Sequence, residues 1–156
     1  MKNTHKIIVL WFCLGVVYYS LEGFFHLFTN GGWANVLMLP IGGFCCVAVG
    51  AINQAPVFYK LNILFQSLIG AVVVTVVEFI SGCVLNLWLG LGIWDYSKFP
   101  LNCKGQICLL FSFAWFFLMP LAIWLEDFFR LKLWNEGEYY SLGDIYKELF
   151  GIKVNR

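Results

Sequence analysis

Two glutamates interrupt long apolar segments of this sequence, where a charged side chain is unexpected. Glu22 and Glu78 each have an apolar run on both sides. A carboxylate in the hydrocarbon core of a bilayer costs several kcal/mol, so an ionisable residue there marks a candidate site. Counted from segment starts near Ile7 and Leu61, they lie about 22 Å and about 25 Å along their helices at 1.5 Å per residue. If both helices start on the inner side, both carboxylates reach a similar depth in the outer half of the membrane.

Other polar and aromatic residues are predicted at the same level. His26 follows Glu22 by four residues and shares its helix face. The stretch "GIWDYSKFPLNCKG" (92–105) is unusually polar for a loop between apolar segments, and its aromatic rings could form a rim or stack on a cation or a sugar ring. Asn86 would line the wall of the resulting polar pocket. The predicted substrate-binding residues are Glu22, His26, Glu78, Asn86, Trp94, Asp95 and Tyr96.

Each of these residues also has a structural interpretation. Trp94 and Tyr96 could be anchors at the membrane interface, and Asp95 could cap the turn before Ser97. The two glutamates could be structural, hydrogen-bonded to neighbouring helices. Glu22 and His26 could together bind a metal ion, but two ligands do not make a metal site. The sequence predicts no catalytic set, no metal site and no cofactor.

Composition identifies the class of protein. Of the 156 residues, 61% are hydrophobic and 12% are charged, whereas a soluble domain has about a quarter charged residues. The net charge of +1 argues against a nucleic-acid partner, which requires clustered Lys and Arg. Four of the six cysteines lie within apolar runs and behave as small hydrophobic residues. The sequence predicts an integral membrane protein with lipid as its surroundings.

The predicted fold is all-α, a polytopic bundle of four transmembrane helices. The spans are expected at 7–28, 33–52, from 61 onward, and 107–125. The third apolar run continues to Trp94, and a straight helix of that length would approach about 50 Å. We therefore expect a break near Ser81–Gly82, where Ser and Gly weaken the helix, followed by a re-entrant or interfacial segment.

The basic residues predict the orientation. Cytoplasmic loops carry an excess of Lys and Arg. The N-terminus, the second loop and the tail hold five of them, against two in the third loop: Lys2, Lys6, Lys60, Arg130 and Lys132 against Lys98 and Lys104. This predicts a multi-pass protein of the cell membrane with both termini inside and loop 92–105 outside.

The C-terminal segment is predicted to be a cytoplasmic tail, 133–156, attached to a transmembrane domain, 1–132. Ser141 is placed to cap a helix, with Asp144 three residues on and Gly151 closing it. One face of this helix is apolar: Leu142, Ile145, Tyr146, Leu149 and Phe150. The helix could lie on the inner leaflet or dock a cytosolic partner.

The segment "WDYSKFPLNCKGQICLLFSFAW" (94–115) resembles the hallmark segment of the bacterial type IV ABC-transporter permease family, which consists of small four-span membrane proteins. The resemblance extends over most of the chain. It implies a permease-like protein.

Three functions are consistent with the sequence. The first is a permease-like or transport-associated protein, which could be a homo-oligomer, with an outward-facing acidic pocket for a cation or cationic small solute. The second is a membrane enzyme acting on a lipid or isoprenoid, with Glu22, Glu78 and Asp95 as general acid and base. The third is an accessory or assembly protein in which the tail helix matters most.

Overall fold

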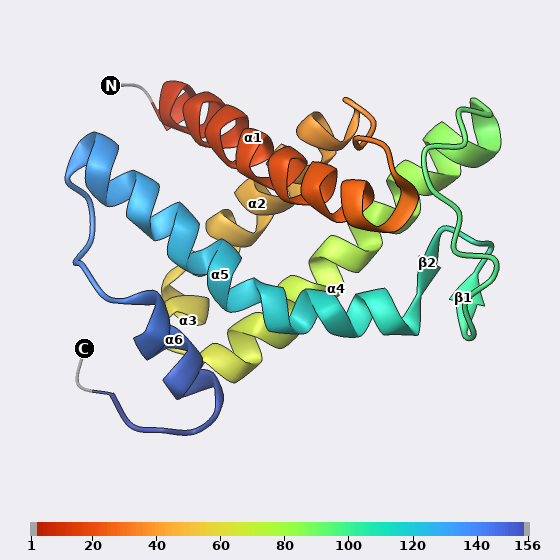
Figure 1. Cartoon of the computed structure of the whole chain (residues 1–156). Coiled ribbons are helices and arrows are strands. Elements are labelled where there is room, and N and C mark those ends of the chain that lie inside the picture. Colours follow the sequence, from red (N-terminus) through yellow and green to blue (C-terminus); the bar gives the residue numbers. More distant parts are fainter. Residues whose placement is uncertain (1–2, 155–156) are drawn as a thin grey trace. The chain divides into compact units, whose positions relative to one another are not determined.

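The computed structural model describes residues 3–154, which form two compact units, one up to Ala48 and one from Val49 onward. The first unit contains α1 (Asn3–Asn30) and most of α2 (Met38–Asn53). The second unit contains the end of α2 and all later elements (Figure 1). These are α3 (Pro56–Tyr59), α4 (Ile63–Gly82), the π-helix η1 (Cys83–Trp88), β1 (Asn102–Cys103), β2 (Ile107–Cys108), α5 (Leu109–Trp134) and α6 (Leu142–Leu149).

Among the described residues, three helical segments are long and apolar enough to cross a membrane. They are Thr4–Thr29, Ile63–Trp88 and Leu109–Trp134, each of 26 residues. At 1.5 Å per residue each is about 39 Å long, which exceeds the hydrocarbon core of about 30 Å. The helix α2 is also apolar, but its 16 residues reach only about 24 Å. A helical membrane protein is confirmed, with three full-length candidate spans.

The third apolar segment changes its helix type where a break was predicted. The α-helix ends at Gly82, but the chain continues as the π-helix η1 to Trp88. The backbone N–H of Leu89 then donates to the Val84 carbonyl at 2.9 Å. Gly90 has a positive φ of 67°, which glycine adopts readily, and it starts the extended segment that leads into the loop. The predicted break at Ser81–Gly82 is therefore wrong in its place: the helix continues there with π hydrogen bonding and ends only after Trp88.

Glycines allow the helices of the first unit to approach closely. A Cβ on Gly15 would lie 2.6 Å from the Leu39 carbonyl oxygen, and one on Gly42 would lie 2.2 Å from the Tyr18 ring. Both distances are too short for any side chain other than hydrogen. Small residues at such contacts are typical of packed membrane helices.

In the second unit α4 packs against α5, and the two cross in Figure 1. The Met119 sulfur occupies the space where a Cβ on Gly70 would lie, 2.7 Å away. The loop between these helices contains a small antiparallel hairpin, with Asn102 paired to Cys108. The fold is mostly helical, as predicted, and this short β-ladder is confined to the polar loop. The fourth span starts at Leu109 and runs nine residues beyond its predicted end at Leu125.

The tail helix α6 forms as the sequence predicts. The Ser141 hydroxyl accepts from the Asp144 backbone N–H at 3.1 Å, and Gly151 follows the helix with a φ of 78°. The apolar face of α6 packs against α4 and α5, so that Ile145 is fully buried and Leu149 nearly so. This part of the face is covered by the chain's own helices, whereas Phe150 stays exposed.

Tyr146 attaches α6 to α5 near Pro120. Its hydroxyl donates to the Phe117 carbonyl at 2.9 Å, one turn before the proline. Burial raises the pKa of this hydroxyl, so it remains a donor at neutral pH. We expect Tyr146→Phe to lower the free energy of unfolding by about 1 kcal/mol, because one neutral hydrogen bond is lost. Thermal unfolding of the purified protein in detergent measures this change. Tyr139→Phe, at an exposed tyrosine, is the control, and equal effects of the two changes would contradict the attachment.

Candidate functional site

Glu78 lies on α4, where the loop and α5 both contact it. Its side chain is buried, with 8% of the residue exposed. The Tyr96 hydroxyl donates to one carboxylate oxygen at 3.0 Å, and the Trp115 indole N–H donates to the other at 3.1 Å. Each carboxylate oxygen therefore has a hydrogen-bond donor from another part of the chain. We call Glu78, Tyr96, Phe99, Phe111 and Trp115 the Glu78 cluster.

Aromatic packing holds Tyr96 in this cluster. Its ring stacks on Phe111 with the ring centroids 4.7 Å apart, and Phe99 meets both rings edge-on. The Tyr96 backbone N–H donates to the Gly105 carbonyl at 2.7 Å, which ties the start of the loop to its end. The loop thus directs one phenol toward the carboxylate and surrounds it with aromatic rings.

A second set of hydrogen bonds, which we call the Gln106 network, anchors the loop on η1 and α4. Asn86 donates to the Trp94 carbonyl at 3.0 Å and to the Gln106 side-chain oxygen at 2.8 Å. The Trp94 indole N–H donates to the Gln106 carbonyl at 3.0 Å. Gly82 leaves room for this network, because a Cβ there would lie 2.6 Å from the Gln106 side-chain oxygen. Asn86 and Trp94 therefore hold the loop against the helix.

Asp95 points along the loop and caps its turn. Its carboxylate accepts from the Ser97 backbone N–H at 2.8 Å and from the Ser97 hydroxyl at 2.9 Å. These hydrogen bonds, the backbone one first, lower the pKa of the Asp95 carboxyl. Stabilisation from a lowered pKa is present above the unfolded value and is lost as the pH falls through the folded one. The capping interpretation of Asp95 matches this geometry.

Glu22 and His26 belong to the first unit. The Tyr18 hydroxyl donates to Glu22 at 3.0 Å, and the Tyr18 ring packs on Gly42. His26 meets the neighbouring Phe25 ring edge-on. Both predicted site residues are partly buried on α1. Within the second unit the structure pairs Glu78 with Tyr96 and Asn86 with Trp94, while Asp95 contacts Ser97; that all seven predicted residues form one substrate site stays a prediction.

The helices and the loop that form the Glu78 cluster fall within a known protein family. A family model described as "Putative ABC-transporter type IV" matches residues 7–136, which include α1, α2, α4, α5 and the whole loop. The chain belongs to this family. No curated protein and no solved structure matches it.

Membership of the type IV ABC-transporter family agrees with the helices. Two of the three full-length apolar segments lie wholly within the matched residues, and the first lies within them from Ile7 onward; the chain is an ABC-transporter-type membrane protein. The match ends at Glu136, so α6 lies outside it.

One buried carboxylate was missed by sequence reasoning. Glu126 on α5 is 1% exposed and forms an ion pair with Arg130, while Gln54 donates to it at 3.3 Å. The predicted span ended at Leu125, so Glu126 fell just outside the predicted spans and was not considered as an intramembrane carboxylate. Its spacing of four residues from Arg130 is a helical signal that the sequence does contain.

Trp115 and Gln106 were also missed as contributors to the site. Trp115 contacts Glu78, which lies 37 positions earlier in the sequence, and Gln106 contacts Asn86, which lies 20 positions earlier. Nothing in the local sequence around either residue signals these contacts.

Proposed function

We propose that the chain is a transport-associated membrane protein whose Glu78 cluster is part of an acidic pocket for a cation or a cationic small solute. The observation that carries this proposal is the buried Glu78 carboxylate, held by Tyr96 and Trp115 within a candidate span. A fixed negative charge in a low-dielectric setting attracts cations strongly. The rings of Tyr96 and Trp115 lie next to the carboxylate, and aromatic rings attract cations. Family membership supports transport as the setting.

The proposed topology has four membrane segments with both termini in the cytoplasm. With the N-terminus inside, α1 crosses outward, and α4 starts inside if loop 92–105 is outside. The chain must then return through α2, although α2 is only about 24 Å long. A bilayer thins locally around a short segment at a modest cost. The Lys and Arg distribution between loops supports the same orientation.

This topology is testable by cysteine accessibility. Cys103 is exposed in the loop, so the test uses a Cys103→Ser background. We expect a membrane-impermeant maleimide to label Lys98→Cys in intact cells, because the loop faces outward. Lys153→Cys should react only after the cells are permeabilised. The reverse pattern would contradict the proposed orientation.

The cation proposal predicts a stability change that depends on Glu78. A ligand that binds the folded protein raises its stability in proportion to ln(1 + [L]/Kd). We expect methylammonium chloride to raise the unfolding temperature of the purified protein more than sodium chloride does at equal ionic strength. Glu78→Gln should lower this rise, because the Glu78 site is lost, and Glu148→Gln, the same change on α6, should preserve it. An equal rise in the wild type and Glu78→Gln would contradict the proposal.

A specific observation also favours an accessory or assembly role as the second candidate. Both Glu22 and Glu78 accept hydrogen bonds from neighbouring side chains, as structural carboxylates do. An accessory role predicts that Glu78→Gln weakens folding without changing any response to cations. The comparison of unfolding temperatures with methylammonium chloride therefore separates the two candidates.

A further inference from the structure

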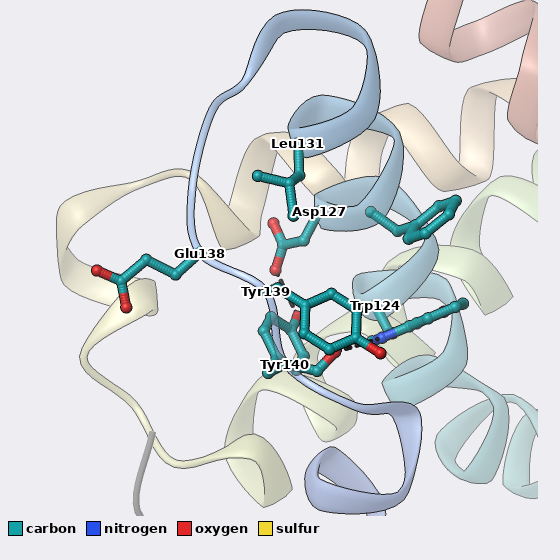
Figure 2. A pocket seen from close by; sticks show the side chains of 7 residues that line it. Trp124, Asp127, Leu131, Glu138, Tyr139 and Tyr140 are labelled. Carbon is teal, nitrogen blue, oxygen red and sulfur yellow. Dashed lines mark hydrogen bonds between the residues drawn. The ribbon is translucent and has the colours of Figure 1, made fainter.

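A small pocket lies near the C-terminal end of α5, where the chain leaves the helix and folds back along it (Figure 2). We call it the aromatic pocket, and apart from one leucine it is lined by four aromatic side chains and two carboxylates: Trp124, Asp127, Phe128, Glu138, Tyr139 and Tyr140. Figure 2 shows Tyr139 and Tyr140 beside Trp124 and Asp127. Tyr139 is 71% exposed, so the pocket has an accessible edge.

Hydrogen bonds within the wall fix its rings. The Tyr140 hydroxyl donates to Asp127 at 2.6 Å, and the Trp124 indole N–H donates to the Tyr140 carbonyl at 3.0 Å. The Trp124 ring stacks on Phe128 with centroids 5.1 Å apart. These donors are used inside the wall, which presents carboxylate charge and aromatic faces to a ligand. Both features attract cations.

The local charge and the size of the pocket narrow the class of ligand. Residues 126–140 contain four acidic and two basic residues, a net charge of 2 − 4 = −2. The ammonium of Lys132 already lies 5.7 Å from the centre of the Phe128 ring, which shows that this aromatic group accepts an ammonium neighbour. The cavity volume of about 10 Å³ is that of one water-sized group. A primary ammonium has this size, whereas a trimethylammonium group is larger.

The position of the pocket indicates where its ligand comes from. Trp and Tyr concentrate at the level of lipid headgroups; the last turns of α5 carry Trp124 and Trp134, and Tyr139 and Tyr140 lie in the segment that follows. We infer that the aromatic pocket binds the primary ammonium group of a phospholipid headgroup, of the ethanolamine type. Asp127 supplies the carboxylate in the wall, the Glu138 carboxylate lies at the edge and points away from the rings in Figure 2, and the aromatic rings supply the faces. This lipid site is separate from the Glu78 cluster and does not depend on the proposed function.

Native mass spectrometry of the full-length protein in detergent tests this inference. The probes are phosphatidylethanolamine and phosphatidylcholine with identical acyl chains. We expect the ethanolamine lipid to bind about fivefold more tightly, which corresponds to about 1 kcal/mol, a typical cation–π contribution. Glu138→Gln combined with Tyr139→Ala should remove this preference. Glu148→Gln, the same charge change outside the pocket, should keep it.

A second variant protects the test against misfolding. Asp127→Asn keeps an acceptor for the Tyr140 hydroxyl while it removes one charge from the wall. It should also lower the preference for the ethanolamine lipid. Equal binding of the two lipids by the wild type overturns the inference, as does a preference that survives both pocket variants or is lost equally in Glu148→Gln.

Discussion

Arg130→Met is expected to destabilise the protein by about 3 kcal/mol, because it leaves the Glu126 carboxylate buried without its charged partner. Glu126 is 1% exposed and packs against Gly50, where a Cβ would lie 2.6 Å from its side chain. The carboxylate is therefore confined, with the Gln54 amide as a neutral donor at 3.3 Å. Thermal or denaturant unfolding in detergent measures the loss.

The double variant is the decisive control for this prediction. Glu126→Leu combined with Arg130→Met replaces the ion pair by apolar side chains of similar size, which is often close to neutral for buried pairs. We expect the double variant to lie within about 1 kcal/mol of the wild type. Glu126→Leu alone should be milder than Arg130→Met, since Arg130 also contacts Glu136 at 3.4 Å and is partly exposed. A double variant less stable than Arg130→Met would contradict this account.

Gly82→Leu is expected to have a comparable effect through a different mechanism. A Cβ at Gly82 would lie 2.6 Å from the Gln106 side-chain oxygen and 3.1 Å from the Trp94 ring. The added side chain must displace the Gln106 network, and overpacking of this kind costs about 1–3 kcal/mol before any hydrogen bond is lost. We also expect the loop to become sensitive to protease, because the network holds it against η1.

The matched control for Gly82→Leu is Gly143→Leu on α6. At Gly143 the nearest atom to a new Cβ is the Ser141 hydroxyl oxygen, 3.7 Å away, which is an ordinary contact. Both changes replace a helical glycine, so both gain about the same helix propensity, up to about 1 kcal/mol. The difference in the free energy of unfolding between the two variants therefore measures the close contact. Equal stability would show that Gly82 is not required for the loop to dock.

The sequence predicted the features that depend on local chemistry. The Ser141 cap and the glycine after α6 each follow from a few neighbouring residues, whereas the break predicted at Gly82 is replaced by a π-helix. The apolar runs likewise predicted the helices α1, α4 and α5, because burial in a bilayer depends on length and hydrophobicity.

The parts that sequence reasoning missed depend on contacts between distant residues. Trp115 meets Glu78 across 37 positions, and the hairpin forms only when Asn102 pairs with Cys108. The tail helix was expected to face lipid or a partner, but its apolar side packs on α4 and α5, with Ile145 fully buried. An amphipathic pattern shows that a face is buried and does not show what covers it.

The central claim is that the Glu78 carboxylate, held by Tyr96 and Trp115, is the cation-binding group of a transport-associated protein. The most direct measurement is the NMR signal of the Trp115 indole N–H, assigned through Trp115→Phe, during titration with methylammonium chloride. A charge-assisted hydrogen bond from this N–H to Glu78 makes its chemical shift sensitive to a cation at the carboxylate. We predict a saturable shift in the wild type and none in Glu78→Gln. A wild-type signal that does not move with methylammonium, or one that moves equally in Glu78→Gln, would contradict the claim.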